Sequence, residues 1–86
     1  SIETSISMAV KSVTSIEYTV YGADYSDVKV AFITQGGFEA YLSETPGVVV
    51  IKSPADFIPE QGRIMAIFTI NNSQRSSVKI ITINKL

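Results

Sequence analysis

The sequence predicts an all-β domain, built as an antiparallel sandwich of two sheets with seven short strands. Apolar residues recur at every second position in several separate runs, which is the period of a strand that is buried on one face. Turn-forming residues interrupt these runs at intervals of roughly 8 to 12 residues, a spacing typical of sandwiches and small barrels. No segment carries the 3.6-residue apolar period of an amphipathic helix.

The first two strands are predicted in the N-terminal quarter of the chain. Segment 2–13 holds the first, because its apolar side chains fall two residues apart from Ile6 to Val10. The second lies over 16–21, where the run IEYTVY repeats the alternation. The residues GAD at 22–24 then supply a break, since glycine and aspartate favour turns.

Three further strands are predicted in the middle of the chain. The alternating runs VKVAFI at 28–33 and FEAYLS at 38–43 flank the pair Gly36-Gly37. Because glycine adopts the positive φ that tight hairpin turns require, this pair is predicted to join the two strands as a hairpin. The residues TPG at 45–47 predict the next reversal, which leads into a β-branched fifth strand over 48–51.

The C-terminal third predicts a long loop followed by two strands. Segment 53–62 contains two prolines and ends in glycine, so it is expected to cross between sheets with Phe57 or Ile58 tucked beneath it. The elements that follow are a sixth strand over 63–70, a turn over 71–74 and a last strand over 78–83. This pattern describes a seven-stranded antiparallel immunoglobulin-like β-sandwich, with a small Greek-key barrel as the alternative.

Length and charge restrict the functions that the chain can have. Its 86 residues make a single domain with one modest core. The net charge is -1 and the basic residues are scattered singly, so no nucleic-acid binding is expected. No uninterrupted apolar run approaches the roughly 18 residues that insert into a bilayer. Because predicted strands run up to both ends, we expect residues 1–86 to be a module of a longer protein.

Three short runs give the sequence a resemblance to a known family. They are IEYTVYG at 16–22, QGGFEA at 35–40 and NNS at 71–73. In these runs the chain resembles the bacterial immunoglobulin-like modules of BACON type, which are accessory units of secreted and surface proteins of gut anaerobes. The resemblance covers roughly residues 14 to 84. It departs from the pattern at Phe38, where such modules often carry tryptophan.

The resemblance implies an extracellular or cell-surface location and a role as a spacer, an adhesive unit or a carbohydrate-associated module. The implied partners are neighbouring domains of the same polypeptide, or a glycan or host surface protein. It implies no catalytic residue and no cofactor.

The residue types themselves also favour a non-catalytic domain without a metal site. Histidine and cysteine are absent, which removes the commonest general base, zinc ligand and thiolate nucleophile. Asp24 and Asp27 bring two carboxylates into one turn, as a calcium site would need, but the EF-hand pattern of ligands is missing. We therefore interpret them as residues of a polar turn.

Three tyrosines are candidates for a sugar-binding platform, because an exposed tyrosine can stack its apolar ring on a sugar. Tyr18 shares the parity of Ile16 and is expected in the core. The candidates lie on the other parity or in a loop, and they are Tyr21, Tyr25 and Tyr41.

The last two strands carry apolar residues on both parities, which predicts an outward apolar stripe. Ile64 and Ala66 define the inner face of the sixth strand, so Met65 and Ile67 are expected to point outward. The last strand is expected to contribute similarly. The predicted interdomain patch comprises Met65, Ile67, Ile81 and Ile83, and a loop or the first strand covering these residues is the alternative.

Overall fold

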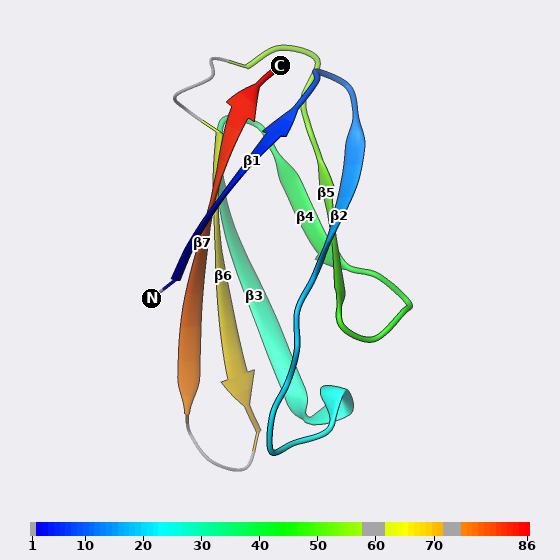
Figure 1. Ribbon diagram of the computed structural model, residues 1–86, viewed down its shortest axis with the longest axis vertical. Helices are drawn as coiled ribbons and strands as arrows, with labels where there is room; N and C mark the ends of the chain where they lie inside the picture. Colours follow the sequence, from blue (N-terminus) through cyan, green and yellow to red (C-terminus); the bar gives the residue numbers. More distant parts are fainter. Residues whose placement is uncertain (1, 58–61, 72–74) are drawn as a thin grey trace.

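The computed structural model describes residues 2–57, 62–71 and 75–86, and these form an all-β, sandwich-like fold (Figure 1). The strands are β1 (Ile2–Met8), β2 (Val13–Glu17), β3 (Val28–Gln35), β4 (Glu39–Leu42), β5 (Val48–Lys52), β6 (Gly62–Ile70) and β7 (Ser76–Lys85). One turn of 3-10 helix, η1 (Tyr25–Asp27), precedes β3, and no α-helix occurs in the described residues. The prediction of an all-β domain is confirmed.

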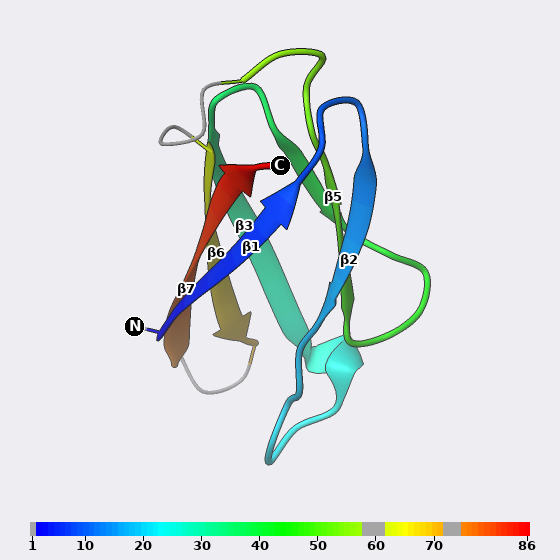
Figure 2. The same ribbon diagram turned by 45° about the horizontal axis from the view of Figure 1, so that its top comes forward.

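The strands form two sheets, with the orders β1-β7-β6-β3 and β2-β5-β4. No ladder joins the two sheets within the described ranges, as a closed barrel would require. The prediction of a wholly antiparallel fold is wrong at one pair, because β1 runs parallel to β7 from Ile2 opposite Lys79 to Met8 opposite Lys85. Both ribbon views show these two strands side by side (Figures 1 and 2).

The turn between β1 and β2 comes earlier than the alternation suggests. The chain leaves β1 after Met8, and Lys11 adopts a positive φ of 51° in the turn. The side chain of Ser53 fixes this turn, because its Oγ accepts the Ser12 N–H at 2.8 Å and donates to the Ala9 carbonyl at 2.7 Å. Ser53 directly follows β5 and lies about 40 residues from this turn in the sequence, so the position of the turn depends on tertiary contacts.

The predicted hairpin at Gly36-Gly37 is wrong. Both glycines have the positive φ that was expected, 88° and 83°. However, β3 pairs with β6 and β4 pairs with β5, so the chain passes from one sheet to the other at this point. Positive φ turns the chain sharply in either case, and pairing with later strands decides which sheet it joins.

The reversal at Gly47 and the crossing loop after β5 match the predictions. Gly47 has a φ of 83°, and β4 and β5 pair as an antiparallel hairpin around it. The loop after β5 crosses to the other sheet and buries Phe57, which is 5% exposed. The alternative anchor Ile58 and residues 72–74 of the last turn lie outside the described residues.

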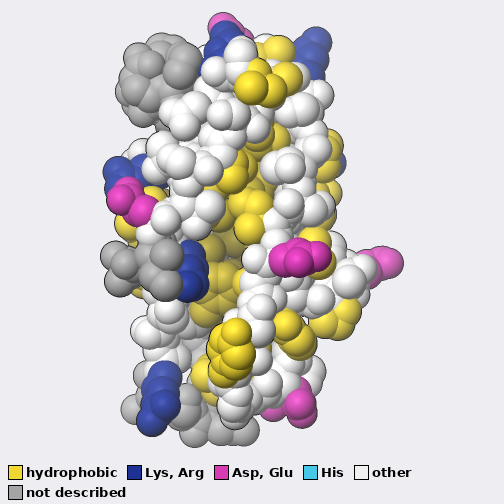
Figure 3. Space-filling view, viewed as in Figure 1, with side chains coloured by type: hydrophobic (Ala, Val, Ile, Leu, Met, Phe, Trp, Pro, Cys, Tyr) yellow, Lys and Arg dark blue, Asp and Glu magenta, His cyan; other side chains and the backbone are white. Residues whose placement is uncertain are grey.

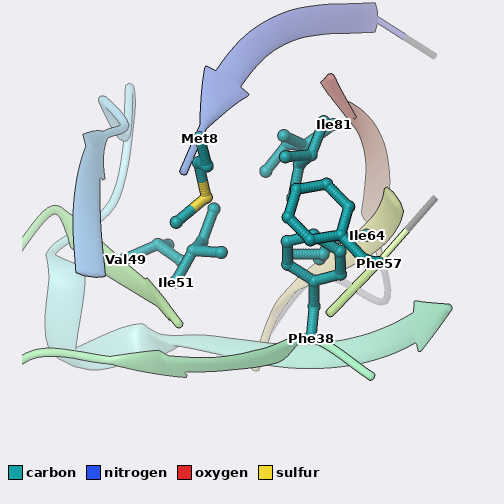
Figure 4. Close-up of a cluster of buried hydrophobic side chains, with 8 residues drawn as sticks. Met8, Phe38, Val49, Ile51, Phe57, Ile64 and Ile81 are labelled. Atoms are coloured by element: carbon teal, nitrogen blue, oxygen red, sulfur yellow. The ribbon is translucent and has the colours of Figure 1, made fainter. Parts of the chain in front are cut away.

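The core lies between the two sheets, and its side chains come from both sheets and from the crossing loop (Figure 4). The ring of Phe38 packs edge-on against that of Phe57, with 4.8 Å between their centroids. Met8 at the end of β1 closes one side of the cluster. The buried apolar residues are Met8, Phe38, Val49, Ile51, Phe57, Ile64, Ala66, Ile81 and Ile83.

Candidate binding surfaces

The structure corrects the parity of the last strand. Ile81 is 6% exposed and Ile83 is fully buried, so neither belongs to an outward patch. In the antiparallel β6–β7 ladder Ile64 lies opposite Ile81, and residues directly opposite each other share a face of the sheet. Because Ile64 is also fully buried, Ile81 and Ile83 must point inward. The prediction placed the apolar residues of β7 one position out of phase.

An outward apolar face exists nevertheless, formed by β3, β6 and β7. Met65 lies between Ile33 and Ile80 in one row across the sheet, and Ile67 lies between Ala31 and Val78 in the next. We call these residues the outer patch: Ala31, Ile33, Met65, Ile67, Val78 and Ile80. Ile33 is 55% exposed, and no outer-patch residue belongs to the core cluster or packs against it. Met65 and Ile67 therefore lie on the outer face, whereas the partners predicted for them in β7 do not.

The outer patch is bounded by polar rows. Gln35 lies opposite Arg63, which lies opposite Thr82, at one end of the patch. Lys29 and Thr69 form the row at the other end. Three strands ~4.8 Å apart and two rows of side chains ~7 Å apart give a footprint of about 200 Å². This is a small apolar centre within a polar surface.

A groove of about 400 Å³ opens between the two sheets beside the core, and Tyr18 both lines the groove and packs against the core cluster. One wall is the extended segment 18–21 that follows β2, and the other comes from β3, β6 and β7. The apolar lining residues are Tyr18, Val20, Tyr21, Val28, Phe68 and Ile70. Figure 3 shows hydrophobic side chains gathered in the hollow between the layers. We call this the inter-sheet groove.

The inter-sheet groove is open because the inner face of β7 changes character along the strand. Lys79 and Ser77 line the groove, whereas Ile81 and Ile83 fill the core further along the same face. The strand is continuous through this change, with an unbroken register against β6. Lys79 is half-buried and takes part in no ion pair of the described residues. The sequence alternation did not predict this groove, because its two walls come from segments that lie far apart in the sequence and belong to different layers.

The floor of the groove is formed by aromatic rings that pack on one another. Tyr18 packs on Phe68 with 5.1 Å between ring centroids and on Tyr25 at 5.7 Å. The backbone N–H of Tyr18 donates to the carbonyl of Gly47 at 2.8 Å, which attaches segment 18–21 to the three-stranded sheet. The wall is therefore held in place on the side away from the opening.

The three candidate tyrosines for sugar binding lie in three different settings. Tyr21 is 85% exposed at the mouth of the inter-sheet groove. Tyr25 packs its ring on Tyr18 and donates its hydroxyl to the Tyr18 carbonyl at 3.3 Å. Tyr41 lies on β4 beneath the Nζ of Lys52, 5.7 Å from the ring centroid. No two of the three candidate rings pack together within the described residues.

The described residues contain no group of three or more carboxylates that could hold a metal ion. They also contain no buried charged side chain. Within these ranges, no helix has the length and apolar character needed to cross a membrane. Comparison with family models, curated proteins and solved structures found no match.

Proposed function

We propose that this chain is a non-catalytic, immunoglobulin-like accessory module of an exported bacterial cell-surface protein, where it spaces domains and packs against a neighbour. The outer patch carries the proposal, because its two apolar rows lie on the outer face of the four-stranded sheet. Ala31 and Ile33 are exposed there, the four patch residues of β6 and β7 are half-buried, and apolar side chains gathered on an outer face favour a contact surface. The resemblance to BACON-type modules supports the cell-surface setting.

The strand order supports the immunoglobulin-like part of the proposal. In constant-type immunoglobulin domains, one sheet contains the second, fifth and fourth strands, and the other contains the seventh, sixth and third. Here the sheets contain β2-β5-β4 and β7-β6-β3 in those orders. The difference lies in β1, which joins the edge of the second sheet beside β7.

The size of the outer patch favours a neighbouring domain of the same polypeptide as its occupant. A stable complex of separate chains buries about 800 Å² on each partner, several times the ~200 Å² apolar footprint. A covalent link raises the effective concentration of a neighbour, so a smaller contact suffices. The polar rows around the patch also fit an interdomain contact, which is more polar than an obligate interface.

The test compares the chain alone with the chain in its parent polypeptide, using urea unfolding of this module. Burying ~200 Å² of apolar surface is worth at most about 5 kcal/mol, so the neighbour is expected to raise the unfolding midpoint measurably. Ile67→Lys places a charge at the centre of the outer patch and is expected to abolish that gain. Thr69→Lys is the control, because Thr69 lies on the same face of β6 in the polar row.

Both substitutions are expected to change the stability of the chain alone by about 1 kcal/mol or less, since neither residue lies in the core. The proposal is wrong if the parent polypeptide gives the module no added stability. It is also wrong if Ile67→Lys and Thr69→Lys reduce the added stability equally.

A further inference from the structure

We propose that the free edge of β3 pairs with β3 of a second copy of this chain, in an antiparallel two-fold dimer centred on Phe32. β3 lies in the interior of the chain and at the opposite edge of the four-stranded sheet from β1. The pairing uses the backbone of β3 and leaves the outer face of the sheet open. It therefore stands or falls separately from the contact proposed for the outer patch.

The strand β3 pairs with β6 on one side only, as both ribbon views show (Figures 1 and 2). Its register with β6 is unbroken from Val28 to Gln35, and within the described residues no strand pairs with its other side. Edge strands of natural proteins are often protected by bulges, prolines or charged side chains. Because β3 has no bulge, no proline and a single charge, at Lys29, its edge is a template for another strand.

Two hydrogen bonds show which backbone groups of β3 face the free edge. The Asn71 N–H donates to the Asp27 carbonyl at 2.9 Å, which continues the β3–β6 ladder by one residue. The next N–H along the strand, that of Val28, donates instead to the Tyr25 carbonyl in η1. Alternate residues of an antiparallel ladder direct their N–H and C=O groups to opposite sides. The even-numbered residues of β3 therefore direct theirs to the free edge.

The residues that present backbone groups along this edge are Val30, Phe32 and Thr34. No backbone hydrogen bond of the described residues engages their N–H groups on that side. In an antiparallel pair centred on Phe32, Val30 of each copy lies opposite Thr34 of the other, and the two Phe32 residues lie opposite each other. These three pairs exchange two hydrogen bonds each, so the dimer gains about six.

The outward side chains of β3 are arranged symmetrically about Phe32, which favours a second copy as the partner. In order along the strand they are Lys29, Ala31, Ile33 and Gln35, and all four are exposed. The order is polar, apolar, apolar, polar, so an antiparallel copy places Ala31 opposite Ile33 and Lys29 opposite Gln35. A two-fold interface requires this self-complementarity, because the same surface serves both partners.

The charge of Lys29 and the outer patch fit the same register. Lys29 of one copy lies opposite Gln35 of the other, so about 20 Å separate the two lysines, more than the screening length of ~8 Å at physiological salt. Parallel pairing in register would bring the two lysines together. Ala31 and Ile33 each end one row of the outer patch at β3. The antiparallel pairing therefore joins the apolar rows of one copy to those of the other.

The contact is small, so the dimer is expected to be weak. Pairing of residues 29–35 at ~3.3 Å per residue, in a layer ~10 Å thick, covers about 230 Å² of each copy. Stable complexes bury about 800 Å² on each partner. We therefore expect a dissociation constant on the order of 0.1–1 mM.

The test is sedimentation velocity of the 86-residue chain from about 20 µM to about 2 mM. A monomer is expected at the lower concentration, and more than half of the chains are expected in dimers at the higher one. Amide hydrogen exchange at both concentrations then locates the contact. Exchange at Val30, Phe32 and Thr34 is expected to be slower at the higher concentration, whereas exchange at Ala31 and Ile33, whose N–H groups face β6, is expected to be unchanged.

Thr34→Pro and Thr34→Ala form a matched pair of variants. The proline removes an N–H that faces the free edge and none that bonds to β6, a position where edge strands tolerate proline. Because the change occurs in both copies, it removes two hydrogen bonds from the dimer. Thr34→Pro is expected to weaken the dimer about 25-fold relative to Thr34→Ala. Circular dichroism of both variants checks that the fold is retained.

Gln35→Glu and Gln35→Lys test the register without altering the backbone. Each places a charge opposite Lys29 of the second copy, so the glutamate is expected to tighten the dimer about threefold and the lysine to weaken it about threefold. Arg63 of the same chain lies opposite Gln35 in monomer and dimer alike, so it does not account for a difference in dimerisation. Both effects are expected to decrease at high salt.

Three results would overturn the proposal. The first is a chain that remains monomeric at about 2 mM. The second is a dimer in which the Val30, Phe32 and Thr34 amides exchange as in the monomer, or in which the two variants of either matched pair behave alike, since the contact would then lie elsewhere. The third is assembly beyond two copies, because a two-fold pairing of one edge closes at the dimer.

Discussion

Ile80 and Ile83 form a matched pair for testing the structure. Both are isoleucines of β7, but the side chain of Ile80 points outward and that of Ile83 points into the core. Ile83 is fully buried and lies opposite Gly62, whereas Ile80 lies opposite Met65 in the outer patch. Substitution by valine keeps the β-branched side chain at both positions, so strand propensity is nearly unchanged. Any difference between the two variants therefore reports packing.

The magnitudes follow from the burial of each side chain. Ile83→Val is expected to cost about 0.5–1.5 kcal/mol and Ile83→Ala about 2–5 kcal/mol, since the surrounding core cannot fill the cavity completely. The same changes at Ile80 are expected to cost about 0.5 kcal/mol for valine and about 1 kcal/mol for alanine. A domain of this size has a total stability of roughly 4–13 kcal/mol.

Urea unfolding followed by far-UV circular dichroism measures these differences. With a slope of about 1 kcal/mol per molar urea, Ile83→Ala is expected to lower the midpoint by about 2 M or more. In thermal unfolding each kcal/mol corresponds to about 4–8 °C, so Ile83→Val alone is expected to lower Tm by several degrees. Equal losses at Ile80 and Ile83, or a larger loss at Ile80, would refute the assigned parity of β7.

Three other predictions concern stability and are measured by thermal unfolding. A Cβ at Gly62 would lie 2.7 Å from a β7 carbonyl oxygen, so Gly62→Ala is expected to cost about 1–3 kcal/mol. Gly22 lies in open space at a φ of 79°, so Gly22→Ala is expected to cost about 1 kcal/mol. A larger loss of stability for Gly22→Ala than for Gly62→Ala would contradict the packing at Gly62. Phe57→Ala is expected to cost about 3–5 kcal/mol and Phe57→Leu clearly less, and a negligible loss in both would contradict the anchoring of the loop. Asp56→Asn is expected to change stability by under about 0.5 kcal/mol, because the ion pair with Lys85 is 3.6 Å long and Asp56 is 92% exposed; a larger loss would show a stronger pair.

The sequence located all seven strands because alternation is a local signal, but the second was displaced: it was predicted over 16–21 and β2 spans Val13–Glu17. Each predicted strand overlaps an observed one, and the reversal at Gly47 forms as expected. Strand pairing was less predictable, as Gly36 and Gly37 show. Their positive φ suits both a hairpin and a passage between sheets, and only the ladders β3–β6 and β4–β5 distinguish the two.

The parity of β7 could not be predicted for a different reason. The run VKIITI at 78–83 places two apolar residues and one polar residue on each face. Its periodicity therefore fits both orientations equally. The ladder with β6 resolves the ambiguity, because it places Ile81 opposite the fully buried Ile64. That register depends on contacts distant in sequence.

The two candidate surfaces lie on opposite faces of the first half of β7. In the first half of β7 the inward residues Ser77 and Lys79 are polar and the outward residues Val78 and Ile80 are apolar, which is the reverse of a pattern that favours folding. Stability alone would favour apolar residues facing inward, because burial removes them from water. Disagreement between a local pattern and the fold is expected at functional positions, where binding compensates for lost stability. Four consecutive residues thus give the first half of β7 a polar inner face, beside the otherwise apolar lining of the inter-sheet groove, and an apolar outer face. This reversal is the physical reason for proposing contacts at this end of the sandwich.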